Sequence, residues 1–295
     1  MSNLPPLIAL RAFEALGRMG SVRAAGDELG VSHTVVSRHI HNLEARLQVQ
    51  LAEPLGRGLA LTAEGVRFHT EVVKAFDIIV RATADLERAH RKTLEVWCVP
   101  GLANRRLLPL LSELTDNLPG YEIVLRPTLS RPNLERGEAD AEVIYLSNSI
   151  PCAGRRIYSL AQPRVFPVAS PAFCERFGRV ANLESLLKLP LIHEESTEQW
   201  RRWFSTAGLA SATPLYGLQL WHADLAIEAA RLGQGVALTN DVLTAEDIRS
   251  GSLVELGTSN VSLGAYYLVC LEAREEALPL AMLRRWLTGI FGSSG

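Results

Sequence analysis

A change of pattern near Leu94 limits the folds open to this 295-residue chain more than any single motif does. Up to about residue 90, apolar residues recur at three- and four-residue steps, which is typical of amphipathic helices. From Leu94 onward, short apolar runs alternate with helical stretches, and this alternation predicts an α/β domain with mostly parallel sheets. The sequence therefore predicts a helical N-terminal third and a larger α/β part, long enough for two small lobes.

The N-terminal third begins with three predicted helices. The first has an apolar stripe and ends near Gly17 and Gly20. Ser21 is a suitable N-cap for the second helix, and Ser32 is one for the third. Gly30 separates these two helices, so the pattern predicts two helices joined by a short turn.

The third predicted helix has one apolar side and one polar side. Helix-turn-helix proteins place the first turns of such a helix in the major groove, where polar side chains reach base edges. The polar side consists of Ser32, His33, Thr34, Ser37, Arg38 and His41. Ser21, Arg23 and Arg57 complete the predicted DNA-binding set. A three-helix module without a role in DNA binding is the alternative.

The stretch EPLGRGLALT (residues 53–62) comes next, and its proline and two glycines predict a β-hairpin. Such a hairpin fits as a wing, with Arg57 at its tip able to reach the DNA backbone or a minor groove. Charge is sparse, because residues 1–62 hold six arginines and five acidic residues. This small excess predicts few phosphate contacts and modest affinity per domain, so a dimer or tetramer would be needed to hold DNA.

The histidines of the third helix could instead suggest a metal site. His39 and His41 lie two apart and point to different sides, and His33 is too far around the helix from His41 to share an ion. No cysteine or carboxylate completes a ligand set, so we expect no metal.

The four cysteines lack a CxxC pair, and we expect unpaired thiols, with a redox switch as the alternative. They are Cys98, Cys152, Cys174 and Cys270.

A long helix is predicted from Thr62, a suitable N-cap, to about Ala89. Two columns of apolar residues with seven-residue spacing run along it. They are Val66, Val73 and Val80, and beside them Val72, Ile79 and Leu86. Adjacent columns sustained over about four turns predict packing against a partner helix, and hence dimerisation. The alternative is a long helix that lies on its own domain.

The α/β part has none of the motifs that mark common active sites. The sequence contains no GxSxG, P-loop or HExxH pattern, and the GxGV at residues 233–236 ends a predicted helix instead of opening one. We therefore expect no catalytic residues and no cofactor. Polar or small residues do occur at strand-to-helix junctions, where α/β proteins bind small ligands. These junctions are residues 100–104, 130–131, 147–148, 195–197 and 219–224.

The segment LIALRAFEALGRMGSVRAAGDELGVSHTVVSRHIHNLEARLQVQL, followed by GRGLALTAEG, resembles the winged helix-turn-helix of LysR-type transcriptional regulators. The opening LPPLIALRAFEA is similar to the subgroup that includes the glycine-cleavage activator. RRLLPLLSEL, WRRWFSTAGL and AIEAARLGQGVAL then follow in the order expected for this family. The resemblance covers nearly the whole chain.

The resemblance implies a sequence-specific DNA-binding regulator, controlled by a small effector bound between the two lobes of a periplasmic-binding-protein-like (type 2) α/β domain. It implies a homodimer that assembles into a homotetramer, with operator DNA, the effector and RNA polymerase as partners. The implied domains are a winged helix-turn-helix over residues 1–62 (helix-turn-helix about 21–47), a linker helix over 62–90, a hinge at 91–93 and an effector domain over 94–290. The first lobe would span about 94–162 and 266–290, and the second about 163–265.

The implied effector site lies at the strand-to-helix junctions. The loop after the first strand usually carries Ser or Thr in this family, whereas here it is Val99–Leu102. This departure predicts a less polar ligand, or one held from the other lobe by Thr197, Gln219 or His222. Arg131 could still supply charge. The full predicted set is Pro100, Gly101, Leu102, Ala103, Ser130, Arg131, Ser147, Thr197, Gln219 and His222.

The DNA-binding domain also departs from the family. The recognition helix of relatives usually begins Thr-Gln-Ser, and here residues 32–34 are Ser-His-Thr. A basic residue is common where this chain has His41, and a usual Phe and Arg near the wing are replaced by Ala52 and Glu53. We therefore expect an altered base preference and weaker contact with the DNA backbone.

Two other functions compete with regulation. A solute-binding or sensor protein would account for residues 94–290 but not for the DNA-binding domain, and an enzyme lacks any paired acid–base or nucleophile set. The sequence contains no run of about 18 apolar residues, so we expect no membrane span. The N-terminus also lacks a signal-peptide pattern, and we therefore expect a cytoplasmic protein. The net charge of −2 still allows a local DNA-binding surface.

Overall fold

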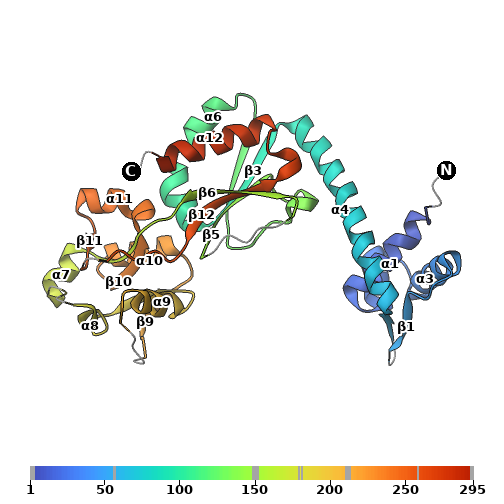
Figure 1. Cartoon of the computed structure of the whole chain (residues 1–295), viewed down its shortest axis with the longest axis horizontal. Helices are drawn as coiled ribbons and strands as arrows, with labels where there is room; N and C mark the ends of the chain where they lie inside the picture. Colours follow the sequence, from blue (N-terminus) through green and yellow to red (C-terminus); the bar gives the residue numbers. More distant parts are fainter. Residues whose placement is uncertain are drawn as a thin grey trace. The chain divides into compact units, whose positions relative to one another are not determined.

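The computed structural model describes residues 4–55, 58–147, 153–178, 180, 182–209, 214–257 and 259–292, with the backbone alone for residues 58, 84, 85 and 87–91. The chain forms two compact units, Met1–Asp85 and Leu86–Gly295 (Figure 1). The predicted order of helix-turn-helix, wing, long helix and two-lobed α/β domain is confirmed.

The first unit is built from α1 (Leu7–Met19), α2 (Val22–Leu29), α3 (His33–Leu47), β1 (Ala52–Leu55), β2 (Gly58–Leu61) and α4 (Ala63–Arg91). The side chain of Ser21 accepts a hydrogen bond from the N–H of Ala24, and that of Ser32 accepts one from the N–H of Val35, each at 3.4 Å. Both predicted N-caps are therefore confirmed. Strands β1 and β2 pair antiparallel, which confirms the hairpin, whereas Arg57 at its predicted tip lies outside the described residues.

Gly17 differs from its predicted role. Helix α1 continues through it to Met19, and Gly20, with φ +64°, forms the left-handed C-cap. A Cβ on Gly17 would lie 2.3 Å from Cδ2 of His69, so the glycine lets this imidazole of α4 pack on α1. His69 Nε2 also donates a 2.9 Å hydrogen bond to the carbonyl oxygen of Glu14. These contacts hold α4 against the helix-turn-helix.

An apolar core joins the helices of the first unit. Its buried side chains include Leu10, Phe13, Leu16, Val36, Ile40, Leu43, Leu51 and Val72. Phe13 is completely buried, and its ring centroid lies 5.5 Å from that of Phe68 on α4. Replacing a buried phenylalanine by alanine costs about 3–5 kcal/mol, so this residue is a large contributor to the stability of the unit.

The second unit contains two five-stranded sheets, one in each lobe (Figure 1). The order is β4-β3-β5-β12-β6 in the first lobe and β11-β7-β10-β8-β9 in the second. Two strand pairs in each sheet are parallel and two are antiparallel, so the prediction of mostly parallel sheets is wrong for half of each sheet. The antiparallel pairs involve β12 and β7. The chain reaches each of these strands directly from the other lobe and not through a crossover helix within the same sheet.

The first lobe is made of β3 (Thr93–Cys98), α5 (Pro100–Leu102), η1 (Ala103–Leu107), η2 (Leu108–Leu110), α6 (Leu111–Asn117), β4 (Glu122–Pro127), η3 (Leu134–Arg136), β5 (Ala141–Leu146), β6 (Arg155–Ala161), β12 (Ala265–Leu271), η4 (Glu272–Arg274) and α12 (Leu278–Gly292). The helical segment after β3 is irregular, with a π-helical and a 3₁₀ segment before α6. Pro109 interrupts it because proline has no N–H to donate. Helices α6 and α12 lie together on one face of the sheet (Figure 1).

The second lobe is made of β7 (Val165–Ala169), α7 (Pro171–Phe177), α8 (Leu183–Leu186), β8 (Leu191–Glu194), α9 (Glu198–Thr206), β9 (Gly217–Leu220), α10 (Ala223–Arg231), β10 (Val236–Asn240), α11 (Asp241–Ser250) and β11 (Val254–Glu255). Trp200 and Trp203 on α9 are fully buried, and their indole N–H groups donate to the carbonyls of Ile192 (2.8 Å) and Val165 (2.9 Å). These bonds satisfy the polar atoms that the large side chains bring into the core.

Several elements are absent from the sequence-based prediction. Strands β6, β9 and β11 and helix α11 were not expected. In the predicted junction at residues 219–224, Trp221 and His222 form the loop between β9 and α10. In the described parts of the chain, no helix is both long and apolar enough to cross a bilayer.

Candidate functional site

The polar side of α3 is the first candidate site. All six polar residues predicted to face DNA are exposed: Ser32, His33, Thr34, Ser37, Arg38 and His41. On the opposite side, Val36, Ile40 and Leu43 are buried in the core. Because these three recur at helical spacing, they fix which way the first turns of α3 face. His39 lies between the two sides and is half-buried.

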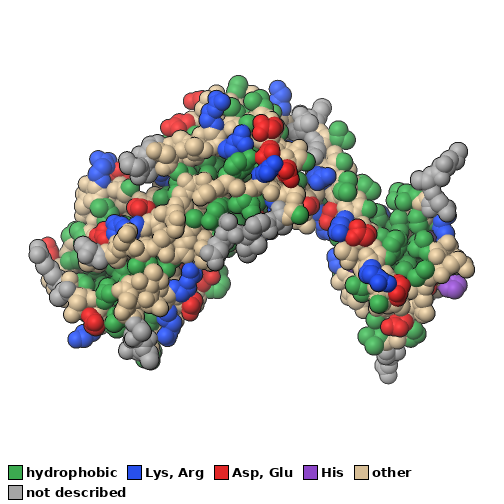
Figure 2. Space-filling view, in the orientation of Figure 1, with side chains coloured by type: hydrophobic (Ala, Val, Ile, Leu, Met, Phe, Trp, Pro, Cys, Tyr) green, Lys and Arg blue, Asp and Glu red, His purple; other side chains and the backbone are tan. Residues whose placement is uncertain are grey.

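The cationic groups of the first unit differ in how free they are. Arg23 and Arg38 are exposed, and neither has an ion-pair partner among the residues that the structure describes. Arg18 is held by the carboxylates of Glu14 and Glu28, and these hydrogen bonds raise its pKa further above its ordinary value. On the face drawn in Figure 2, basic and acidic side chains are interspersed. The charge available for phosphate contact is therefore sparse.

Glu44 connects α3 to the wing. Its Oε1 accepts hydrogen bonds from the N–H groups of Leu51 and Ala52, both at 2.9 Å. Thr62 closes the other end, because its hydroxyl donates to the carbonyl of Gln50 at 2.9 Å and accepts from the N–H of Gly65 at 3.0 Å. The wing is thus fixed relative to the exposed side of α3, although the predicted wing residue Arg57 lies outside the described part.

A cavity of about 210 Å³ between the two lobes is the second candidate site. Four of the predicted effector residues line it: Pro100, Gly101, Leu102 and His222. The other lining residues are Val99, Leu129, Tyr145, Val165, Glu194, Glu195, Gln199, Trp221, Ala223, Thr239, Asn240, Leu243 and Tyr266. The lining comes from both lobes, so the cavity is suited to a ligand that holds the lobes together.

Six predicted effector residues do not line this cavity: Ala103, Ser130, Arg131, Ser147, Thr197 and Gln219. The charge of Arg131 is engaged elsewhere, because its guanidinium pairs with the buried carboxylate of Glu142. The Gln219 amide donates to the carbonyl of Glu195, and Thr197 accepts from Arg201 on α9. The side chains of Arg131, Gln219 and Thr197 are therefore engaged within the protein.

Sequence reasoning missed six residues that line the cavity. Five lie at strand ends and one, Gln199, lies on α9; the five are Tyr145, Glu194, Thr239, Asn240 and Tyr266. Tyr145 and Tyr266 come from neighbouring strands β5 and β12, and their ring centroids lie 4.9 Å apart. Asn240 Nδ2 donates to the Tyr266 hydroxyl at 3.1 Å. The available signal was the polar pair Thr239-Asn240 directly after the apolar run of β10, which marks a strand end.

The polar groups of the cavity are unusual in their surroundings. Burial raises the pKa of Glu194 to about 7, and neighbouring Glu195 and Asp224 add to this effect. Burial also raises the pKa of Tyr145 to about 12. The Tyr145 hydroxyl and the Thr239 hydroxyl have no hydrogen-bond partner within the described residues. Such groups cost free energy unless a ligand or water pairs with them.

Gly101 brings the lobes into close contact at the cavity. A Cβ at this position would lie 3.0 Å from the Cβ of Ala223 and 3.4 Å from Cδ1 of Leu243, both in the second lobe. A larger side chain would therefore press the lobes apart. The glycine sets the width of the cavity at this edge.

The long helix α4 has the apolar columns that predict a partner helix. Val72 and Phe76 pack in or against the core of the first unit, and the same face continues as Ile79 and Val80. The predicted dimerisation residues Val66, Ile79, Val80 and Leu86 are exposed, and Val73 is half-buried. Beyond Phe76, the described residues therefore leave this face exposed at Ile79, Val80 and Leu86.

The described residues contain no group of three or more His, Cys, Asp or Glu side chains placed to hold a metal ion. Cys98 and Cys270 are unpaired and buried, and burial raises the pKa of both thiols, that of Cys270 to about 11. Cys174 is unpaired and half-buried, and Cys152 lies outside the described residues.

Two family descriptions match the chain. One, "Bacterial regulatory helix-turn-helix protein, lysR family", matches residues 7–66, and the other, "LysR substrate binding domain", matches residues 87–291. The glycine cleavage system transcriptional activator of Escherichia coli K12 is 31% identical over 287 residues, which are 97% of this chain and 93% of that protein. The regulator TrpI of Pseudomonas aeruginosa is 35% identical over 254 residues, covering 85% and 86% of the two chains.

Solved structures show the same fold. CrgA, a LysR-type transcriptional regulator from Neisseria meningitidis, matches 99% of this chain and 100% of its own with a TM-score of 0.60 at 20% identity. The effector domain of the regulator AmpR of Pseudomonas aeruginosa matches 69% of this chain and 97% of its own with a TM-score of 0.59 at 24% identity.

Proposed function

Because the chain belongs to the LysR family of bacterial transcriptional regulators, we propose that α3 binds an operator and that a small effector in the interlobe cavity controls this binding. One observation carries the DNA-binding half. Six polar residues face outward from the first turns of α3, above a core that fixes their direction. A helix presented in this way inserts its N-terminal turns into the major groove.

Each part of the exposed set has a role in the proposal. Base edges are contacted by the side chains that can donate or accept hydrogen bonds there, namely His33, Thr34, Ser37, Arg38 and His41. Arg23 and the N-cap residues Ser21 and Ser32 contact phosphates near the helix ends. Arg57 completes the set from the wing. The Ser-His-Thr sequence at residues 32–34 gives this protein a base preference that differs from that of its relatives.

The sparse charge supports an oligomer. Few free cations allow only a shallow salt dependence for one domain, so two or four domains must act together on one site. The uncovered face of α4 supports a homodimer through paired α4 helices, with Ile79, Val80 and Leu86 between them. Two dimers form the proposed tetramer, which acts on the chromosome in the cytoplasm and contacts RNA polymerase.

The experiment that tests this function is a mobility-shift assay with the DNA upstream of the protein's own gene. We expect a discrete retarded complex that survives excess unrelated DNA and follows the stoichiometry of a dimer or tetramer. A solute-binding protein without regulatory function would give no retarded complex. Binding equal to that of unrelated DNA would contradict the proposal.

A further inference from the structure

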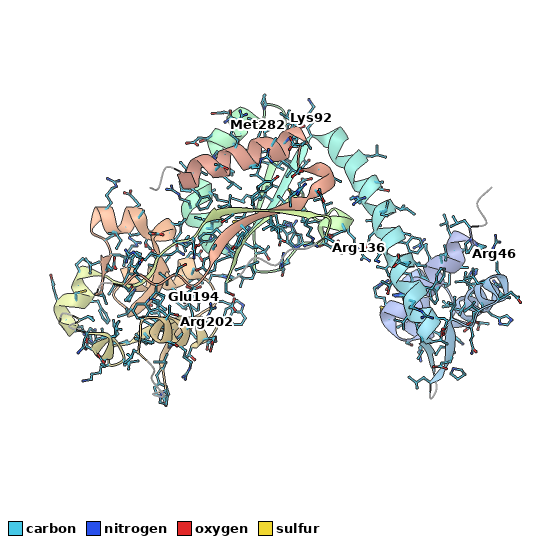
Figure 3. The ribbon with its side chains drawn as sticks, viewed as in Figure 1. Arg46, Lys92, Arg136, Glu194, Arg202 and Met282 are labelled. Carbon is cyan, nitrogen blue, oxygen red and sulfur yellow. The ribbon has the colours of Figure 1, made fainter. Side chains whose placement is uncertain are left out.

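The carboxyl group of Glu194 lacks a counter-ion in the interlobe cavity. The residue ends β8, lines the cavity, and accepts a long hydrogen bond of 3.5 Å from the Gln199 side chain. Arg202, on the neighbouring helix α9 (Figure 3), donates instead to the carbonyl of Leu263 at 3.0 Å. No ion pair with Glu194 occurs among the described residues. A carboxylate withdrawn from water without a partner is costly to the fold.

A second group in the same cavity also lacks a partner. Thr239, at the end of β10, is only 4% exposed, and its hydroxyl has no hydrogen-bond partner within the described structure. The hydroxyl of the half-buried Tyr145 also has no hydrogen-bond partner among the described residues. Native proteins rarely leave buried polar atoms unpaired, except where a ligand or an ordered water completes them. Both residues line the cavity, so their missing partner belongs inside it.

The walls of the cavity are largely apolar and aromatic. Tyr145 and Tyr266 form one wall, with ring centroids 4.9 Å apart, and Trp221 lies at the exposed edge. Leu129 and Leu243 add aliphatic surface. Aromatic faces attract cations, and the attraction strengthens where water is excluded. Such walls suit an organic body with a positive group at one end.

The charges around the cavity favour a cation over an anion. Among the described residues, neither lysine nor arginine lines it, whereas Glu194 and Glu195 do. Asp224 lies close by. One of its oxygens has no hydrogen-bond partner within the described part of the chain, and the other accepts from the Asn104 side chain at 2.7 Å. The helix ends offer an anion fewer donors than usual, because Asp224 already occupies the first turn of α10 and Pro100 removes one N–H from the start of α5.

We propose that the effector of this protein has a protonated amino group on a largely apolar body, and that Glu194 is its counter-ion. The inference rests on the proposed function of the cavity as the effector site. The Thr239 and Tyr145 hydroxyls accept the remaining N–H donors, and the tyrosine rings cover the body. A simple amine and an amino acid share this chemistry.

The proposal has a consequence for pH. Since the pKa of Glu194 is about 7, a cation must displace its proton below that pH. Amine affinity therefore rises about tenfold from pH 6 to pH 8 and then levels off. The other titratable groups facing Glu194 are Glu195, Asp224, Tyr145 and Tyr266, with His222 on the cavity wall and Arg202 near Tyr145.

The test uses four probes of one shape on the full-length protein. Phenethylamine and L-phenylalanine have the amino group, phenethyl alcohol is neutral, and 3-phenylpropanoate is an anion. Binding is measured by calorimetry and thermal shift at pH 6 and pH 8. We expect at least one amino probe to bind and to raise the melting temperature at pH 8, while the alcohol and the carboxylate do not. Comparing the affinities for L-phenylalanine and phenethylamine shows whether the site prefers an amino acid or a simple amine.

Two variants complete the test. Glu194→Gln should weaken the amino probe on the order of thirtyfold or more and remove its pH dependence. Glu198→Gln, an exposed glutamate on α9 outside the cavity lining, should bind as the wild type does. Failure of both amino probes, equal binding of the carboxylate, or unchanged binding by Glu194→Gln would overturn the proposal. Operator binding, tested separately, would still stand or fall by the mobility-shift assay.

Discussion

The carboxylate of Glu44, on α3, accepts the backbone N–H of Leu51 at 2.9 Å, and the same oxygen accepts that of Ala52 at the start of the wing. Leu51 is buried, so its N–H has no access to water as an alternative partner. This single side chain therefore fixes the wing against the helix that we propose to enter the major groove. This carboxylate ties the start of the wing to α3, while Thr62 holds the other end.

Replacing Glu44 by alanine should loosen the wing. Two hydrogen bonds to a charged acceptor are lost, and a buried N–H is left unpaired, which costs about 2 kcal/mol. Hydrogen–deuterium exchange of the peptide that spans residues 50–55 should accelerate about thirtyfold. Glu71→Ala, which removes only an exposed pair with Lys74, is the control. Protection equal to that of the wild type in Glu44→Ala would rule out this role.

Replacing Gly101 should widen the gap between the lobes. Alanine needs only a shift of a few tenths of an ångström from Ala223, so we expect a change below about 1 kcal/mol. Leucine overpacks the contact with Ala223 and Leu243, which should cost about 1–3 kcal/mol and lower the melting temperature by about 3–10 °C. Differential scanning calorimetry measures both variants. A leucine variant that melts like the wild type would show that the contact is not tight.

Glu194 should destabilise the second unit above neutral pH. Its pKa is about 7 in the folded protein against 4.5 as the ordinary value, so the folded state holds the proton more tightly. The stabilisation is complete below pH 4.5 and is lost as the pH rises through 7. Glu194→Gln should therefore be more stable than the wild type at pH 8, by on the order of 3 kcal/mol, and similar to it at pH 4.5.

Thermal melts of the Glu194→Gln protein at the two pH values give this comparison directly. The Glu198→Gln variant, altered at an exposed position, serves as the reference for a simple loss of charge. If the difference in stability between Glu194→Gln and the wild type is the same at pH 4.5 and pH 8, burial of the carboxylate is not its cause.

Dimerisation through α4 can be tested with a matched pair of isoleucines. Ile78 is 55% exposed and Ile79 is 52% exposed, but only Ile79 belongs to the apolar columns. Ile79→Lys should weaken the dimer strongly, because a charge enters the helix–helix contact, whereas Ile78→Lys should not. Analytical ultracentrifugation across concentrations measures the difference. Equal effects of the two substitutions would mean that the helices pair through another face.

Local patterns in the sequence were sufficient to predict the first unit. Ser21 and Ser32 cap the helices where hydroxyl side chains preceding apolar periodicity predict caps, because this interaction spans only three residues. Gly17 was misjudged because its role depends on His69, more than fifty residues away. A sequence without its fold cannot show which helix approaches a glycine.

The cavity could be predicted only in part, for the same reason. Its first loop, at Pro100 to Leu102, and His222 follow from the rule that ligands bind at the ends of strands. Tyr145 and Tyr266 meet because the chain returns from the second lobe as β12, which pairs with β5. Local periodicity does not encode this long-range contact. Arg131 was expected to face a ligand, but its guanidinium forms an ion pair with Glu142 on β5.

The most direct test of the account is the affinity of a Ser37→Ala, Arg38→Ala double variant for the operator upstream of the protein's own gene. Losing hydrogen bonds to base edges costs about 1–3 kcal/mol for each good contact. We expect operator affinity to fall at least tenfold, while binding to unrelated DNA changes little and Arg249→Ala, at an exposed site on α11, binds normally. Unchanged operator affinity in the double variant would contradict the assignment of α3 as the helix that contacts the bases.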